Sequence, residues 1–215
     1  KKDKIYWECS KCGARSSVYI GRCPQCHEFN TYVKVTENNL NENNNISTNK
    51  KTQRLIDIKS DSIVRLKTGI GEFDRVVGGG IVSDSINILT AVPGAGKSTL
   101  LLSVANKIAE QGKNILYISG EESESQIKLR ADRILDKTSE NIYIRSETNI
   151  DIIFNEIDKI KPALLIIDSI QMMYSNKCDG VVGGDKQLIY VASKLLEKAK
   201  KSDSTFSIFF VSQMT

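Results

Sequence analysis

Short apolar runs alternate with segments of helical periodicity from residue 63 to the end of the 215-residue chain. Five such runs are almost wholly apolar, as is typical of strands that are covered on both faces of a sheet. The strands predicted from them are Ser85–Leu89, Ile115–Ser119, Ile142–Ile144, Ala163–Ile167 and Phe206–Val211. Because helical segments separate these runs, the pattern predicts an α/β fold with a largely parallel sheet.

Four segments between the predicted strands carry apolar side chains at spacings of three and four residues. The first has Leu100, Leu101, Val104, Ala105 and Ile108, and the second has Ile127, Ala131, Ile134 and Leu135. The third has Ile150, Ile153, Phe154 and Ile157, and the fourth has Leu188, Val191, Ala192, Leu195 and Leu196. We interpret these positions as the faces of helices that pack against the sheet.

The first 62 residues follow a different pattern. Residues 1–35 hold two cysteine pairs and a few aromatic side chains, which is too little apolar surface for an unaided core. Seven of the nineteen residues from 36 to 54 are asparagine, and such a polar tract is typical of a solvated linker. We therefore predict a small metal-stabilised module at 1–35, a linker at 36–62 and an α/β core at 63–215.

The cysteine pattern predicts a metal site. Four of the five cysteines form a C-x2-C-x10-C-x2-C arrangement, namely Cys9, Cys12, Cys23 and Cys26. Two intervening residues let each pair wrap one side of a tetrahedral ion, and the predicted ion is zinc, with iron as the alternative. Because four thiolates complete the tetrahedron, we expect a structural or recognition role and place His27 outside the ligand set. Cys178 stands alone and is interpreted as a free thiol.

A phosphate-binding loop connects the first predicted strand of the core to the helix that follows it. The run from Ala91 to Ser98 matches the G-x4-GK[ST] pattern, with alanine in place of the first glycine. Backbone N–H groups and the positive end of the helix would bind the phosphates of ATP. The predicted nucleotide-binding residues are Pro93, Gly94, Ala95, Gly96, Lys97, Ser98 and Thr99. Lys97 is expected at the β and γ phosphates, and Ser98 at Mg²⁺.

Acidic side chains follow two of the predicted strands. Asp168 comes directly after the strand Ala163–Ile167, where open α/β sheets bind their ligands, and is expected to hold Mg²⁺ through its water shell. Glu121 follows Ile115–Ser119, and we predict that it is the catalytic base that orients the attacking water. An acidic first turn of the next helix is the alternative interpretation for this segment. Gln213, past the last strand, is a candidate contact for the γ-phosphate.

Composition narrows the function classes only a little. Hydrophobic residues make up 40% of the chain, and the longest apolar runs fall far short of the roughly 20 residues that span a bilayer. We therefore expect no membrane association. The formal net charge of +4 permits a polyanionic partner without establishing one.

With these motifs in order, the chain resembles the RadA family of bacterial DNA-repair proteins, which are relatives of the RecA recombinases. The resemblance covers most of the chain outside the linker. It is carried by the four-cysteine finger with Gly21-Arg22-Cys23-Pro24 and by the segments Thr68–Gly80, Pro93–Leu102, Tyr117–Ser123 and Ile167–Gln171. It implies a RecA-like P-loop ATPase core behind a zinc-ribbon-like module, with Glu121 at the position of the family's catalytic glutamate.

The resemblance also implies a function. It points to a DNA-dependent ATPase of recombinational repair, which binds single-stranded or branched DNA and drives branch migration. The implied assembly is a homo-hexameric ring, with a recombinase filament as a further partner. The implied location is the cytoplasm of a bacterium, or a DNA-containing organelle of bacterial origin in a eukaryote.

Several positions depart from the family pattern. Tyr19 and Phe29 stand where tryptophans are usual, Asp84 replaces a turn glycine, and Gln213 replaces a histidine. The family's Lys-Asn-Arg-Phe-Gly motif and its Lon-protease-like domain have no counterpart before Thr215. We therefore expect this chain to bind nucleotide but to be a poor motor by itself.

One loop of the chain has two interpretations, and two other functions are compatible with the sequence. The loop from Met172 to Lys186 carries glycines and the DNA-binding candidates Lys177 and Lys186. The residues alone favour a disordered surface loop, whereas the family resemblance favours DNA contact there. The core is also compatible with a small-molecule P-loop kinase whose lid carries zinc. A third interpretation is a zinc-ribbon interaction module whose ATPase is vestigial.

Overall fold

The structure, a computed structural model, describes residues 5–36, 54–57, 64–201 and 205–213. The chain forms two compact units, Lys1–Lys59 and Ser60–Thr215, and each is described by itself. The linker predicted at 36–62 lies almost entirely outside the described residues, apart from a short 3₁₀-helix, η1 (Leu55–Asp57).

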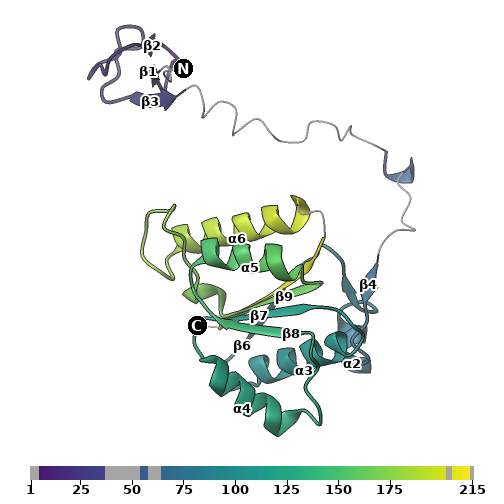
Figure 1. Cartoon of the computed structure of the whole chain (residues 1–215). Helices are drawn as coiled ribbons and strands as arrows, with labels where there is room; N and C mark the ends of the chain where they lie inside the picture. The colour runs from purple at the N-terminus through teal and green to yellow at the C-terminus, as the bar shows by residue number, and fades with distance from the viewer. Residues whose placement is uncertain (1–4, 37–53, 58–63, 202–204, 214–215) are drawn as a thin grey trace. The chain divides into compact units, whose positions relative to one another are not determined.

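The first unit contains a three-stranded antiparallel sheet (Figure 1). Its order is β2-β1-β3, with β1 at Ile5–Cys9, β2 at Arg15–Ser16 and β3 at Tyr32–Thr36. Only Cys9, Cys23 and Tyr32 form its buried cluster, with Trp7 and a few other side chains packed against them. A cluster of this size buries too little apolar surface to hold a fold, so the stability must come from the cysteines.

The second unit is built on a five-stranded parallel sheet in the order β6-β10-β9-β7-β8. The strands are β6 (Ile86–Ala91), β7 (Ile115–Ser119), β8 (Ile142–Ser146), β9 (Leu164–Asp168) and β10 (Ser207–Gln213). A small antiparallel pair, β4 (Arg65–Leu66) and β5 (Ile81–Val82), precedes the sheet, with the short helix α2 (Gly71–Val76) between them. The predicted α/β class with a parallel sheet is therefore confirmed.

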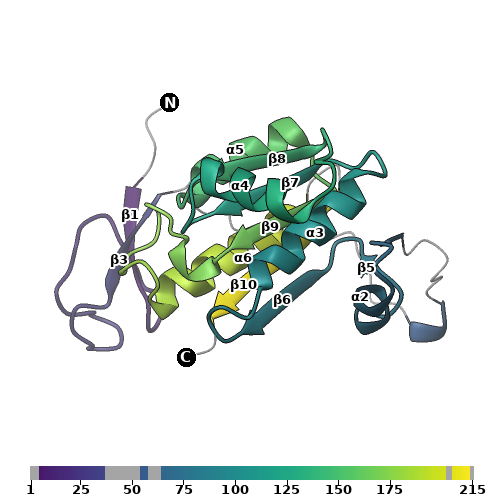
Figure 2. The same cartoon turned by 90° about the horizontal axis from the view of Figure 1, so that it is seen from below.

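Helices cover both faces of the sheet (Figures 1 and 2). Helices α3 (Lys97–Ala109) and α4 (Glu124–Ile134) share one apolar cluster with one face of the strands. Helices α5 (Ile150–Ile160) and α6 (Asp185–Lys201) share a second cluster with the other face, next to the 3₁₀-helix η2 (Ile170–Met172). This double cover explains why the strands are apolar at successive positions rather than at alternate ones.

Side-chain caps fix where two of the helices begin. Ser123 caps α4 in a capping box with Gln126, and the Asn149 side chain accepts a hydrogen bond from the first turn of α5.

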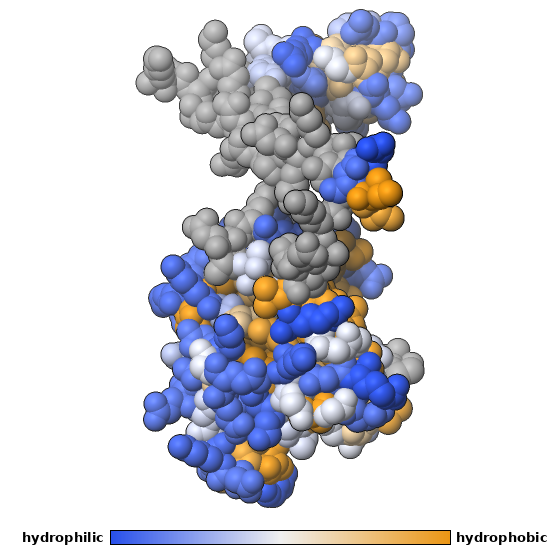
Figure 3. Space-filling model, turned by 90° about the vertical axis from the view of Figure 1, so that its right-hand side faces the viewer, coloured by the Kyte–Doolittle hydropathy of each residue, from blue (hydrophilic) through white to orange (hydrophobic). Residues whose placement is uncertain are grey.

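Hydrophilic side chains cover much of the side drawn in Figure 3. In the described parts of the chain, no helix is both long and apolar enough to cross a membrane.

Three of the predicted helix positions are wrong in detail. Leu100 and Leu196 were expected in the core, but they are 38% and 37% exposed. Leu102, which is not among the apolar positions predicted for this helix, is buried instead, because the face of α3 that contacts the sheet is turned toward it. Leu135 follows α4 as its C-cap residue rather than continuing the helix, although it still packs against the core.

Candidate nucleotide site and metal centre

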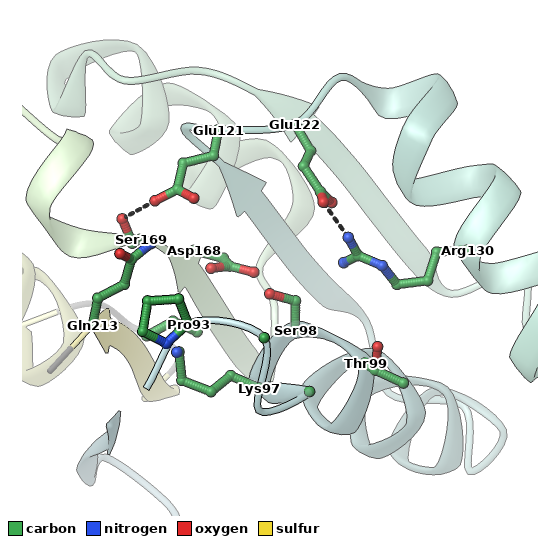
Figure 4. Close-up of a pocket in the computed structure, with 13 residues that line it drawn as sticks. Pro93, Lys97, Ser98, Thr99, Glu121, Glu122, Arg130, Asp168, Ser169 and Gln213 are labelled. Atoms are coloured by element: carbon green, nitrogen blue, oxygen red, sulfur yellow. Dashed lines mark hydrogen bonds and ion pairs between the residues drawn. The ribbon is translucent and has the colours of Figure 1, made fainter. Parts of the chain in front are cut away.

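A cavity of about 340 Å³ opens at the carboxyl ends of the parallel strands, large enough for a small ligand. The side chains around it come from the phosphate-binding loop, from the ends of β7, β9 and β10, and from α4 (Figure 4). Its lining residues are Pro93, Gly94, Gly96, Lys97, Ser98, Thr99, Glu121, Glu122, Arg130, Asp168, Ser169, Val211 and Gln213.

The phosphate-binding loop has the backbone that its glycines predict. Gly94 and Gly96 adopt φ angles of 77° and 84°, which side-chain-bearing residues rarely adopt. Ala91, at the position of the first consensus glycine, instead ends β6 in extended conformation, so its Cβ causes no strain there. The ammonium of Lys97 donates to the carbonyl oxygens of Ala91 at 2.8 Å and Val92 at 3.1 Å. This loop therefore brings a cation and the N-terminus of α3 to the cavity.

Asp168 is held by a residue that the sequence analysis did not single out. The Tyr117 hydroxyl, on β7, donates a 2.6 Å hydrogen bond to Asp168 Oδ2. Burial and then the neighbouring carboxylate raise the pKa of Tyr117 far above its usual range, so the phenol stays protonated and keeps donating. A tyrosine in an otherwise apolar strand is the signal that was available, because a buried hydroxyl needs a partner.

Glu121 is brought beside Asp168 by the register of the sheet. Ser119 is the neighbour of Asp168 across β7 and β9, so the two carboxylates leave the sheet from adjacent strand ends. Ser169 donates a 2.6 Å hydrogen bond to Glu121 Oε1, which orients this otherwise exposed side chain. The peptide bond between Asp168 and Ser169 is cis.

Glu122 lines the same cavity but has a different partner. It forms an ion pair with Arg130 of α4, whose side chain is 18% exposed (Figure 4). Arg130 stands three residues after the buried Ile127, on the apolar face of the helix. An arginine at such a position needs an acidic partner, and this could have pointed to Glu122 from the sequence. The pair neutralises one carboxylate. Glu121 and Asp168 are then the acidic groups of this cavity that have no cationic partner in the part of the chain that the structure describes.

The structure places most of the predicted nucleotide-binding residues around one cavity. Pro93, Gly94, Gly96, Lys97, Ser98, Thr99 and Gln213 all line it. Ala95 does not, because its N–H is turned to the Val92 carbonyl at 3.3 Å. The Ser98 hydroxyl and the Asp168 carboxylate are hard oxygen donors that suit Mg²⁺, and Lys97 suits a phosphate.

The loop between η2 and α6 has a defined conformation, so the expectation of a disordered loop is wrong. The buried Gln187 side chain accepts a hydrogen bond from Ser175 N at 2.9 Å and donates to Ser175 O and Cys178 O at 3.1 and 2.6 Å. Lys177 forms a 2.7 Å ion pair with Asp151. Lys186 is exposed and forms no ion pair within the described residues, so only one of the two predicted lysines offers an uncompensated charge.

The four predicted metal ligands converge. The Sγ atoms of Cys9, Cys12, Cys23 and Cys26 all lie within 4.8 Å of one another, with 3.7 Å between Cys9 and Cys26 and 3.5 Å between Cys12 and Cys23. A tetrahedral ion with metal–sulfur bonds of about 2.3 Å would hold its sulfurs about 3.8 Å apart, so this donor set fits such an ion. His27 is exposed and outside the cluster.

Together, the fold and the two sites define a P-loop nucleotide-binding domain that is accompanied by a four-cysteine ribbon. A family model described as the AAA domain matches residues 52–181, and the chain belongs to this family. A second model, described as a rubredoxin metal binding domain, matches residues 7–34.

Curated relatives point to one kind of protein. The chain is 40% identical over 217 residues to the DNA repair protein RadA of Streptococcus pyogenes, 37% over 212 residues to that of Campylobacter jejuni, and 36% over 222 residues to that of Mycolicibacterium smegmatis. These matches cover 96 to 100% of this chain and 47% of each relative, so the chain spans about half the length of the relatives it matches. The resemblance to RadA that the motifs indicate is thereby confirmed.

Gly120 tests how closely the site is packed. A Cβ at this position would lie 2.5 Å from the Cβ of Met172, so Gly120→Ala must displace either η2 or the segment that carries Glu121. We expect a loss of about 1–3 kcal/mol in the free energy of unfolding, measured by urea denaturation. The matched control is Gly71→Ala, where nothing lies within 4 Å of the added methyl group. An equal effect of both substitutions would contradict the close approach.

Metal removal tests the independence of the ribbon. The only tryptophan, Trp7, packs against the cysteine cluster, so its fluorescence reports on the ribbon alone. We expect a strong chelator to shift the Trp7 emission to that of a solvated indole, because metal binding supplies the folding free energy of such modules. The far-UV circular dichroism of the helices should stay unchanged. Loss of the helical signal together with the metal would show that the two units do not fold separately.

Proposed function

We propose that the chain contains the ATPase of a DNA-repair protein, which hydrolyses ATP in response to single-stranded or branched DNA. The observation that carries the proposal is the single cavity that gathers Lys97, Ser98, Glu121 and Asp168 at the carboxyl ends of parallel strands. The names of the curated relatives support the DNA-repair context. Branch migration is the activity that we expect of a protein with the full length of these relatives.

Each group in the cavity has a proposed role. The loop amides, the α3 N-terminus and Lys97 bind the triphosphate. Ser98 and Asp168 would hold Mg²⁺, which when bound neutralises charge on the β and γ phosphates. Tyr117 orients the Asp168 carboxylate through its 2.6 Å hydrogen bond.

Glu121 is the proposed general base. It has no cationic partner among the described residues, and its hydrogen bond to Ser169 fixes one carboxylate oxygen while the other can accept the proton of the attacking water. Glu122 is not suited to this role because Arg130 neutralises it. Gln213, which lines the cavity and is paired across the sheet with Ala91 at the start of the loop, is the proposed contact for the γ-phosphate.

A homo-hexameric ring completes the proposal. Within the described residues, the cations that line the cavity are Lys97 and Arg130, and Arg130 is already paired with Glu122. Phosphoryl transfer commonly uses an additional cation for the charge that develops in the transition state. We propose that a neighbouring subunit supplies this cation. The isolated chain should therefore bind ATP but hydrolyse it slowly.

We propose zinc as the metal of the ribbon, with a structural role. The four converging sulfurs support a closed tetrahedral site, which has no open position for a reacting water. Elemental analysis of the purified protein separates zinc from iron, and a ratio of one zinc per chain is the expected result.

The catalytic proposal predicts that substitution of two neighbouring glutamates has different effects on the rate of ATP hydrolysis. Glu121→Gln should lower the single-turnover rate of ATP hydrolysis on the order of 10²- to 10⁴-fold while ATP binding is retained. Glu122→Gln is the matched control and should cost far less, and Lys97→Ala should abolish ATP binding. Equal losses from the two glutamines would contradict the assignment. Transfer of the γ-phosphate to a nucleoside would favour the kinase alternative.

The DNA proposal predicts different effects for the two loop lysines. Lys186→Ala should weaken binding to single-stranded DNA and reduce the slope of log K against log salt by about 0.7, because an unpaired lysine releases one counterion. Lys177→Ala should change the slope less, since Asp151 already neutralises that charge. Fluorescence anisotropy at several salt concentrations measures both. Unchanged binding in both variants would place DNA elsewhere on the protein.

A further inference from the structure

The metal ribbon exposes aromatic side chains that its own core does not use. Phe29 is 67% exposed and Tyr19 is 51% exposed, although the buried cluster of this unit consists of only three residues. A closed four-thiolate site leaves no coordination position for chemistry, so the surface of the module rather than its metal is available for a function.

The exposed rings are held in place by neighbouring groups. The guanidinium of Arg22 lies over the Phe29 ring, with 5.2 Å from its Cζ atom to the ring centroid, and the two residues form an antiparallel bridge. The Tyr19 hydroxyl donates to Asn30 Oδ1 at 3.2 Å, and its ring packs edge-on against Trp7 at 5.0 Å. Rings fixed in this way lose little conformational entropy when a flat partner stacks on them.

The charged group that lies against these rings is a cation, Arg22. Residues 5–36 contain four basic side chains, Lys11, Arg15, Arg22 and Lys34, and two acidic ones, Glu8 and Glu28, so their formal charge of +2 would offset the −2 of a zinc ion held by four thiolates. Glu8 is already paired with Arg15 at 2.7 Å. Arg22 donates through Nε to the His27 carbonyl at 3.1 Å, and within the described residues its two terminal nitrogens have no hydrogen-bond acceptor.

We propose that Tyr19 and Phe29, together with Arg22, form a stacking surface for the bases of single-stranded DNA. Aromatic rings stack on unpaired bases of any sequence, and an arginine beside them binds the phosphates between those bases. The inference rests on the proposed function, because it assigns a second DNA contact to a protein that acts on DNA. It differs from the loop contact at Lys186, which acts through charge alone.

Two probes of equal charge distinguish stacking from phosphate binding. A fluorescent oligothymidylate carries bases, whereas an abasic oligonucleotide of the same length carries the same phosphates without them. The full chain should bind the oligothymidylate more tightly. Phe29→Ala should lower that affinity about fivefold to one-hundredfold and leave binding to the abasic probe unchanged. Val33→Ala, at another exposed apolar side chain of the ribbon, is the matched control and should have little effect.

Integrity of the ribbon is checked by metal content and by Trp7 fluorescence, which Phe29→Ala should leave unchanged. Unaltered oligothymidylate binding in Phe29→Ala, or equal binding of both probes to the unmodified chain, overturns the stacking surface. Loss of a protein partner with unchanged DNA binding overturns it as well. ATP hydrolysis without DNA should be the same in Phe29→Ala and the unmodified chain, so its loss in Glu121→Gln tests the proposed function separately.

Discussion

The register between β7 and β9 is the constraint on which the rest of the structure depends. It sets Ser119 beside Asp168, so the acidic residues that follow the two strands leave the sheet at the same place. Parallel pairing of this kind requires apolar cover on both faces, which the helices supply. A slip of one residue would bury these carboxylates or turn them to the opposite face, and the cavity would lose its acidic wall.

A partner for each acidic group is the second requirement, because a hydrogen bond or an ion pair fixes the position of a carboxylate at the cavity. Asp168 has the Tyr117 hydroxyl, Glu121 has the Ser169 hydroxyl, and Glu122 has Arg130. The first two partners are neutral donors, which leave the negative charge available to a metal or a water. The third is a cation, which removes the charge of Glu122 from the same chemistry.

Local patterns were sufficient for the phosphate-binding loop, the cysteine cluster and the five strands of the parallel sheet, whose ends they gave to within two residues. Asp168 and Gln213, which were expected just after their strands, are instead the last residues of β9 and β10, and the short pair β4–β5 was not predicted. Leu100 and Leu196 were misplaced, since a stripe on a helix does not reveal how far the helix is turned toward the sheet. Tyr117, Arg130 and Ser169 were missed because their partners depend on strand order and on packing across the cavity, which spacing along the chain does not give. Gln187 was missed for the same reason, and with it the ordered loop.

The two units obtain their stability by different means, and this difference bears on the part that each would have in the proposed DNA binding. The sheet unit buries large aromatic side chains such as Tyr117 and Phe206 in its core. The ribbon takes its stability from four sulfurs, so Tyr19 and Phe29 are not needed inside. A metal-held module can therefore offer rigid aromatic rings to a partner, which a module of that size held by apolar burial alone could not leave exposed without losing its fold.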